Sequence, residues 1–506
     1  MSGSQRLGRG GLSSILWCGI ASAALYQFLG FAFPMSGYAE RRRLYDLMLL
    51  TGHSAWGALT YASIVILLFV LYWWMARILL RRPHDGGGAR WPLLVICGFG
   101  LLFAGELLGM YPINAADMFG YFFRSRIFVF YRGNPLIDAP HQFPGDPYLY
   151  TVGQYVNMAS PYGPVWELLA GAAALLTRGE LLPNLLALKG VSALSYGGSV
   201  LLVSRILRRI APAQQTSGTL LFAWNPLILL EWVGNGHNDA VMVFWVLLGV
   251  WLWAERQYVW VVPAFVVAAY VKAIAAIAIP LFALDMWFAE SSGLERLHWL
   301  LKTLLLAGAI SLVVFAPFGI PRQYIAEVLN EAKSRVGFSF AVAVDLALQQ
   351  QVLPVLERTL RLSEGTMSTL SRYATIVSRW LSLGGLAALY LRQLGMVWRR
   401  KRDPIVASAE AFYACVLLAP IYRMWYPAWP MTLATLRPNR DRLIRAEAAC
   451  LSAELSVLVY GFAVRWRDLP RLLLGTTLTL LVPTLVPLVD RWMRRLRWWP
   501  GQEQKL

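Results

Sequence analysis

Long apolar runs constrain this chain more than any other feature. The run WGALTYASIVILLFVLYWWMARILL from Trp56 and the run GTTLTLLVPTLVPLV from Gly475 carry no charge until their ends. They approach the roughly 20 apolar residues that a helix needs to cross a bilayer. Since 58% of the 506 residues are hydrophobic and only 15% are charged, we predict an all-α polytopic membrane protein.

The first apolar run, Gly11 to Pro34, follows Arg6 and Arg9. It is longer than the apolar part of a secretory signal peptide, so we interpret it as a retained first helix. The cysteines fall inside apolar runs without metal-ligand spacing, and neither a disulfide framework nor a zinc site is indicated. They are Cys18, Cys97, Cys415 and Cys450.

The net charge of +18 does not indicate a nucleic-acid partner, because the basic residues gather at the ends of apolar runs. The positive-inside rule assigns such clusters to the cytoplasmic face, next to anionic lipid. Both termini are then cytoplasmic. The clusters are Arg81–Arg82, Arg205–Arg209, Arg399–Arg402, Arg437–Arg445 and Arg491–Arg497.

This orientation places residues 111–162 outside the cytoplasm, after the span Trp91 to Met110. The apolar runs predict about 14 spans at bilayer length, including Thr219 to Val233 and a hairpin over residues 258–287 that is broken near Lys272. The run from Pro164 is too short to span and is expected to lie in the outer interface. Arg41 to Arg43 fall on the outside, against the rule.

Three segments follow from this path. Residues 1–90 form an N-terminal extension of two helices, and residues 91–437 form a core with outer loops 111–164 and 317–373. Residues 438–506 form the last spans and a basic cytoplasmic tail. The expected location is a plasma membrane.

Asp117, Tyr121 and Arg124 lie at positions i, i+4 and i+7, so on a helix they share one face. Charged groups beside apolar spans are costly unless they are paired or functional. A carboxylate, a phenol and a guanidinium would then point into one cleft. The alternative is that Asp117 caps a short helix and Arg124 neutralises it.

Two polar motifs belong to the same outer side. SPYGP, with Tyr162, predicts a rigid bend before an interfacial helix, and NGHNDA packs His237, Asn238 and Asp239 between two apolar runs. Asp239 could instead begin the following helix, because Asp is favoured at helix starts.

Two cations add to this set. Lys272 is alone in an apolar hairpin, where it either reaches the interface or meets an anion. Arg423 and Tyr426, in YRMWYPAWP, stand at an outer helix end, where the tryptophans are typical of an aromatic belt.

The order of the motifs resembles bacterial integral-membrane glycosyltransferases of the GT-C superfamily, nearest to those that use polyprenol-phosphate mannose. The motifs run from DMFGYFFRSRIFVFYRGNP through DPYLY, SPYGPVWELLA, NGHNDA, VKAIAAIAIPLFAL and FAPFG to YRMWYPAWP. The resemblance covers roughly residues 90–435, and it rests on the order of the motifs because each alone is weak.

The resemblance implies a multi-span fold, a polyprenyl-phosphate sugar donor, and a catalytic aspartate in the first outer loop that maps onto Asp117. Many relatives carry a second acid beside it, whereas here Ala116 and Met118 flank Asp117. We therefore predict no metal site and no cofactor, although a divalent metal stays open. The acceptor would be a glycolipid or a glycan.

One carboxylate suffices for this chemistry, since the lipid phosphate is already a good leaving group. We expect Asp117 to act as general base and the transfer to invert the anomeric centre. Phosphate or sugar contacts are assigned to Tyr121, Arg124, Tyr162, His237, Asn238, Asp239, Lys272, Arg423 and Tyr426.

Two other classes remain as alternatives. A lipid-linked glycan transporter or flippase should show half-chain repeats and a charged midplane site. A non-catalytic scaffold would not need polar residues gathered on one side.

Overall fold

The computed structural model describes residues 9–36, 55–80, 91–113, 115–290, 292–319, 325–326, 329, 337–466 and 469–495. These residues form helices and turns, without a named strand, and an isolated bridge joins Pro34 to Met110. The all-α prediction is therefore confirmed for the described residues. Arg41 to Arg43, the basic pair at 81–82 and the end of the C-terminal tail lie outside them.

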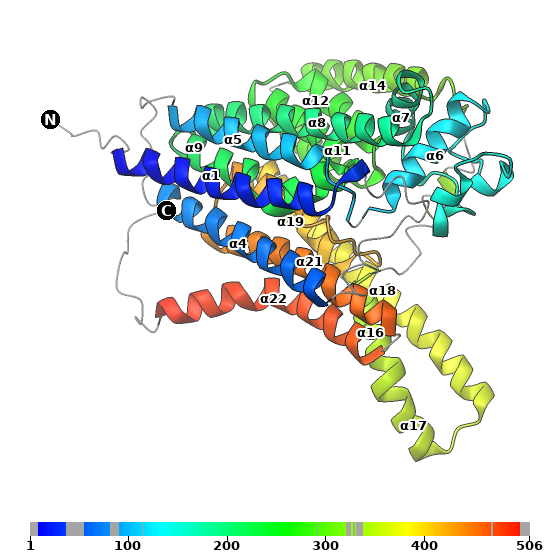
Figure 1. The fold of residues 1–506 in the computed structure, drawn as a ribbon. Coiled ribbons are helices and arrows are strands. Elements are labelled where there is room, and N and C mark those ends of the chain that lie inside the picture. The colour runs from blue at the N-terminus through cyan, green and yellow to red at the C-terminus, as the bar shows by residue number, and fades with distance from the viewer. Residues whose placement is uncertain are drawn as a thin grey trace. The chain divides into compact units, whose positions relative to one another are not determined.

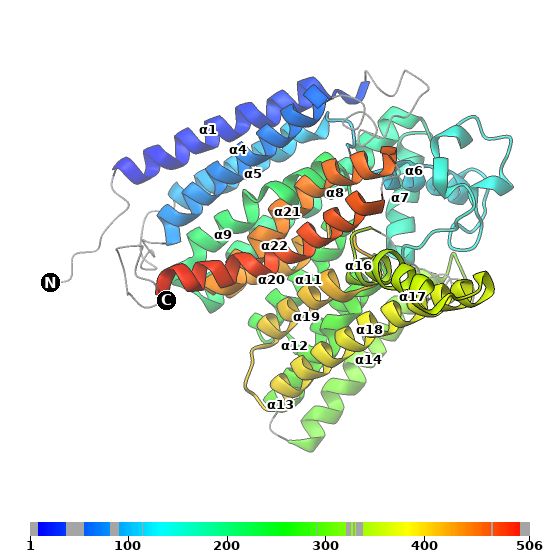
Figure 2. The same cartoon turned by 90° about the horizontal axis from the view of Figure 1, so that it is seen from below.

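The chain divides into two compact units. The first comprises residues 1–50 and 59–331, and the second comprises residues 51–58 and 332–506. Figures 1 and 2 show the helices of both units in two views.

The first unit holds residues 111–164 and most of the candidate residues. Its α-helices are α1 (Arg9–Ala32), α4 (Ala55–Leu80, from residue 59), α5 (Trp91–Leu108), α6 (Asp117–Val129), α7 (Pro164–Leu176), α8 (Leu181–Ile210), α9 (Gln215–Ala223), α10 (Pro226–Ile228), α11 (Asp239–Ala254), α12 (Tyr258–Ala269), α13 (Ala278–Ala289) and α14 (Gly293–Phe315). A π-helix, η5 (Leu229–Gly234), precedes α11, and a 3-10 helix, η6 (Ala273–Ile277), precedes α13.

Helix packing within this unit is set by the apolar faces. α1 lies along α5, α11 packs against both α8 and α12, and α6 packs against α7. Buried polar groups join further helices: the Tyr72 hydroxyl of α4 donates to the Leu221 carbonyl of α9 at 3.0 Å, and the Trp224 indole, just after α9, donates to the Ile96 carbonyl of α5 at 2.9 Å. Such buried donors need partners, and backbone carbonyls supply them here.

The second unit consists of α16 (Phe340–Ala347), η7 (Leu348–Val352), α17 (Leu353–Leu360), α18 (Glu364–Trp398), α19 (Pro404–Leu418), α20 (Ala428–Leu436), α21 (Arg440–Trp466) and α22 (Leu469–Arg495). Consecutive helices from α18 to α22 pack on one another, and α16 packs on α18 and α22. The loop between α19 and α20 carries Arg423 and Tyr426.

Six described helices are long and apolar enough to cross a membrane. They are α1, α4, α5, α8, α14 and α18. α10 with η5 and α11 form a further candidate, in which the chain bends by 119° at the break between the two halves. The chain is thus a membrane protein, while the predicted 14 spans are not confirmed.

The structure departs most clearly from the predicted spans at Thr219 to Val233, which we expected to form one span. Helix α9 ends at Ala223, and a new short helix starts at Pro226. Pro226 lacks an N–H and restricts the residue before it. Asn225 then caps the new start, because its side chain accepts a bond from the Ile228 N–H at 3.2 Å.

The expected break near Lys272 is present. α12 ends at Ala269, Lys272 has extended backbone angles, and the chain resumes as η6 and α13. Because the helix is interrupted at Lys272, the lysine side chain can extend toward another element.

Candidate active site

Asp117 is the first residue of α6, and its carboxylate is bound on both oxygens. The Tyr155 hydroxyl donates to Oδ1 at 2.7 Å, and the Tyr162 hydroxyl donates to Oδ2 at 3.0 Å. The side chain is 8% exposed. Two hydroxyl donors stabilise the charge of a carboxylate and fix its plane, while each oxygen keeps further acceptor capacity.

Tyr162 is positioned by the bend that precedes α7. The Gly163 N–H donates to the Val271 carbonyl at 3.1 Å, and the Val165 N–H donates to the Tyr270 carbonyl at 3.0 Å. A Cβ at Gly163 would collide with the Tyr270 carbonyl, so only glycine permits this approach. Pro164 starts α7, as the SPYGP motif predicts, and the bend brings Tyr162 beside the break at Lys272.

Tyr162 belongs to an aromatic cluster with Tyr121 and Trp166. The Tyr121 ring meets the Tyr162 ring edge to face at 5.0 Å and the Trp166 ring at 4.8 Å. Burial and the Asp117 charge raise the pKa of Tyr121 and of Tyr162 well above the usual value. Both phenols therefore stay neutral, and the Tyr162 hydroxyl donates to Asp117.

Lys272 meets an anion, which was one of the two expected outcomes. Its Nζ lies 2.9 Å and 3.1 Å from the carboxylate oxygens of Asp239, the first residue of α11. The same Nζ is 5.9 Å from the centre of the Tyr162 ring. The lysine side chain is 14% exposed and the Asp239 side chain is fully buried. The pair therefore lies next to Tyr162, one of the two tyrosines that hold Asp117.

The NGHNDA segment forms a buried turn between η5 and α11. Gly236 has φ +73°, a backbone conformation that suits glycine and allows the tight turn. His237 Nε2 lies 3.2 Å from Glu231 Oε2, and both side chains are fully buried. The Asn238 amide is also buried, and neither of its polar atoms has a hydrogen-bond partner within the described part of the chain.

Arg124 is buried and turns back along α6. Its Nη2 donates to the Met158 carbonyl at 3.3 Å, and its Nη1 lies 3.1 Å from where a Cβ on Gly120 would stand. The Nε atom has no hydrogen-bond partner among the described residues. A guanidinium with spare donors in a buried position is suited to an anion.

The positive charge of Arg124 acts on the carboxyl group of Glu167 in α7. Burial raises the pKa of Glu167 to about 7, although the hydrogen bond from Ser160 Oγ at 2.5 Å and the Arg124 charge both lower it. Its Oε2 has no partner among the described residues. This carboxyl therefore titrates near neutral pH.

Arg126 holds α6 to neighbouring segments. Its Nε donates to Asp146 at 2.9 Å, its Nη1 donates to the Gly179 carbonyl at 2.7 Å, and its guanidinium lies 4.7 Å from the Tyr148 ring centre. These contacts tie α6 to the loop that carries Tyr155 and to the start of α8.

The first unit thus brings together most of the predicted residues, namely Asp117, Tyr121, Arg124, Tyr162, Asn238, Asp239 and Lys272, with His237 in the adjoining turn. Arg423 and Tyr426 belong to the second unit. There, Tyr422 packs with Phe338 and Val416, and the Tyr426 ring stacks on Trp429 at 4.0 Å.

Three residues of this site were not predicted from the sequence: Tyr155, Glu167 and Glu231. Tyr155 ends a short 3-10 helix, Gly153–Tyr155, that carries no motif, and only the fold brings it to Asp117. Glu167 and Glu231 were single acids in apolar runs, which was a usable signal since such acids are costly unless they are functional or paired. Within the described residues, no group of three or more His, Cys, Asp or Glu side chains comes together as a metal site would need.

Comparisons with known proteins agree with the motif order. The model of a family described as alpha-(1->6)-mannopyranosyltransferase, N-terminal domain, matches residues 16–289, and a model described as MptB C-terminal domain matches residues 361–484. The first match includes every site residue of the first unit. The second match includes Arg423 and Tyr426.

Two curated relatives are similar over part of their length. Alpha-(1->6)-mannopyranosyltransferase A of Mycobacterium tuberculosis is 26% identical over 300 residues, which are 57% of this chain and 55% of that protein. Alpha-(1->6)-mannopyranosyltransferase B of Corynebacterium glutamicum is 22% identical over 339 residues, which are 63% of this chain and 52% of that protein. The chain therefore spans about half the length of these relatives.

Proposed function

The chain belongs to the alpha-(1->6)-mannopyranosyltransferase family, and from this premise we propose that it transfers a hexose, with mannose favoured, from a polyprenyl-phosphate sugar to a glycolipid or glycan acceptor. The observation that carries the proposal is the carboxylate of Asp117, which two tyrosine hydroxyls hold beside a buried lysine–aspartate pair.

Asp117 is the general base. An acceptor hydroxyl gives its proton to Asp117 as its oxygen forms a bond to the anomeric carbon, and the bond between that carbon and the lipid phosphate oxygen breaks. The electron pair leaves with the phosphate. A single displacement of this kind inverts the anomeric centre, and one carboxylate is enough because the leaving group needs no protonation.

Cations stabilise the negative charge that develops on the leaving phosphate. Arg124 is the strongest candidate, since its buried guanidinium has spare donors. Lys272 adds a point charge next to Tyr162, and Arg423 of the second unit is a further candidate. Tyr121, Tyr162, His237, Asn238, Asp239 and Tyr426 are the proposed partners of sugar hydroxyls.

We place the reaction at the outer face of a bacterial plasma membrane, with both termini in the cytoplasm and about 14 spans. α6 and α7 are 13 residues each, too short to span, and they suit helices in an interface. A lipid phosphate would reach the site from the bilayer, and the acceptor would enter from the aqueous side.

A donor screen tests the proposal. Purified protein is incubated with polyprenyl phosphates that carry mannose, glucose, arabinose or an aminosugar, together with a mannosylated lipid acceptor, and the products are read by mass spectrometry. We expect a hexosylated acceptor with the mannose donor. Movement of the lipid across liposomes without a new product would instead support the flippase alternative.

A further inference from the structure

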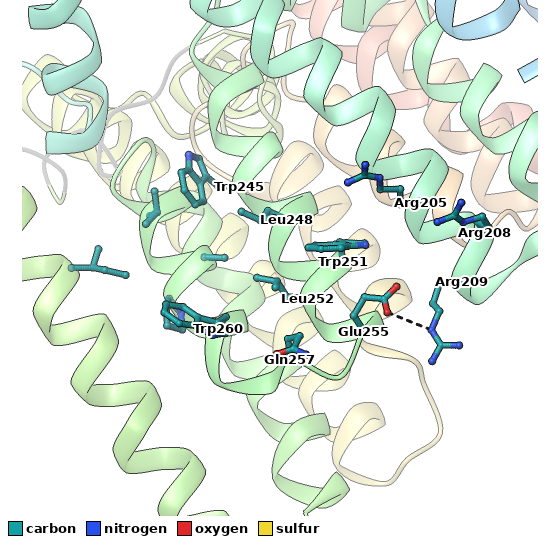
Figure 3. A pocket seen from close by; sticks show the side chains of 14 residues that line it. Arg205, Arg208, Arg209, Trp245, Leu248, Trp251, Leu252, Glu255, Gln257 and Trp260 are labelled. Atoms are coloured by element: carbon teal, nitrogen blue, oxygen red, sulfur yellow. Dashed lines mark ion pairs between the residues drawn. The ribbon is translucent and has the colours of Figure 1, made fainter. Parts of the chain in front are cut away.

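A groove in the first unit lies away from Asp117 and its partners. It has a volume of about 1120 Å³ and is bounded by the end of α8, the second half of α11, α12 and Ile310 of α14. This exceeds the roughly 300–1,000 Å³ of most small-molecule pockets. Figure 3 shows the arginines of α8 at one side of the groove, with Trp251 and Glu255 of the neighbouring segment facing them.

Helix α11 fixes the distance between this groove and the candidate active site. Asp239 is its first residue, and Trp251 lines the groove close to its end at Ala254. A helix of 16 residues is about 24 Å long at a rise of about 1.5 Å per residue. The arginine side of the groove therefore lies at the end of α11 that is opposite Asp239.

The charge at this end is positive. Arg205, Arg208 and Arg209 are exposed, and Arg209 is 3.9 Å from Glu255. No ion pair with Arg205 or Arg208 occurs among the described side chains. Three guanidinium groups beside one carboxylate leave an excess of donors that fit phosphate.

The opposite wall of the groove is apolar. It is lined by Trp245 and Leu248 of α11, Trp260 and Val267 of α12, and Ile310 of α14. The positive-inside rule would account for the arginines but not for the groove, because the rule concerns only where charges lie. A phosphate-binding end that continues into an apolar wall has the two chemical characters of a phospholipid.

We propose that this groove binds an anionic phospholipid of the leaflet opposite the candidate active site. The headgroup phosphate lies between Arg205 and Arg208, and an acyl chain runs along the wall formed by Trp245, Val267 and Ile310. Basic grooves between membrane helices bind anionic headgroups in this way. The bound lipid would hold the ends of α8 and α11 together.

The test uses the full-length protein in detergent and native mass spectrometry. The probes are dioleoylphosphatidylglycerol, dioleoylphosphatidylcholine, a dihexanoyl phosphatidylglycerol and undecaprenyl phosphate. The groove variant is Arg205→Gln/Arg208→Gln, and the control is Arg392→Gln/Arg399→Gln at the exposed end of α18. Both variants remove two charges, and glutamine has nearly the helix propensity of arginine.

We expect the wild-type protein and the control to retain dioleoylphosphatidylglycerol, and the groove variant to bind it about tenfold or more weakly. The short-chain and the zwitterionic lipids should bind more weakly than dioleoylphosphatidylglycerol to the wild type. Equal binding by the groove variant and the control would overturn the site. Equal binding of the short-chain lipid, or preferential retention of undecaprenyl phosphate, would overturn the assigned occupant.

Discussion

Replacing Glu167 by glutamine should change how stability depends on pH. Burial raises the pKa of Glu167 from 4.5 to about 7 in the folded protein. Between these values the folded state holds a proton that the unfolded state has released, so the free energy of unfolding falls as pH rises from about 4.5 to about 7. At roughly 1.4 kcal/mol per pH unit, this loss is of the order of 3 kcal/mol.

The Glu167→Gln variant cannot titrate at this position, yet it still offers an oxygen to the Ser160 hydroxyl. The thermal unfolding midpoint of detergent-solubilised protein should therefore fall more for the wild type than for the variant between about pH 5 and about pH 8. Glu180→Gln, an exposed carboxyl in the same unit, is the control and should follow the wild type. If Glu167→Gln and the wild type lose stability in parallel, the reasoning about the buried carboxyl is refuted.

Four further variants probe the candidate active site. Tyr155→Phe and Tyr162→Phe should each lower kcat/KM by about tenfold to a hundredfold, because each loses a bond to a charged acceptor of about 1.5–3 kcal/mol; unchanged kinetics in folded protein would remove them from the site. Gly163→Ala should destabilise the protein by about 1–3 kcal/mol through its collision with Tyr270, measured as a lower melting temperature. Lys272→Ala removes a buried ion pair and should raise KM for the lipid donor while it lowers stability, and an unaltered KM would contradict a role in donor binding.

The sequence predicted those parts of the fold that depend on local patterns. The apolar runs gave α1, α4 and α5 within a few residues, and the SPYGP motif gave the bend at Gly163. The break near Lys272 also followed from one charge in an apolar hairpin.

The number of spans was not predictable in the same way, because hydropathy does not separate a buried helix from a spanning one. α19 and α20 are only 15 and 9 residues long and are largely buried inside the second unit. Hydropathy predicts a continuous span through Asn225 and Pro226, but together these residues end one helix and cap the next. Tertiary packing decides whether such an apolar segment forms one span or shorter buried helices.

Helical periodicity put Asp117, Tyr121 and Arg124 on one face, and the structure buries all three. It did not reveal that Asp117 is held by Tyr155 and Tyr162, which lie 38 and 45 residues further along the chain. Contacts of this kind come from how the loop folds back on α6, and no spacing rule contains them.

The most direct test of the account is the turnover of purified Asp117→Asn with a polyprenyl-phosphate mannose donor and a glycan acceptor. Asparagine keeps the shape of the side chain and can still accept a tyrosine hydrogen bond, but it cannot serve as a base. The account predicts at least about a hundredfold loss of turnover, with the melting temperature and membrane insertion preserved and Glu180→Gln fully active. A folded Asp117→Asn protein that turns over at the wild-type rate would contradict the central claim.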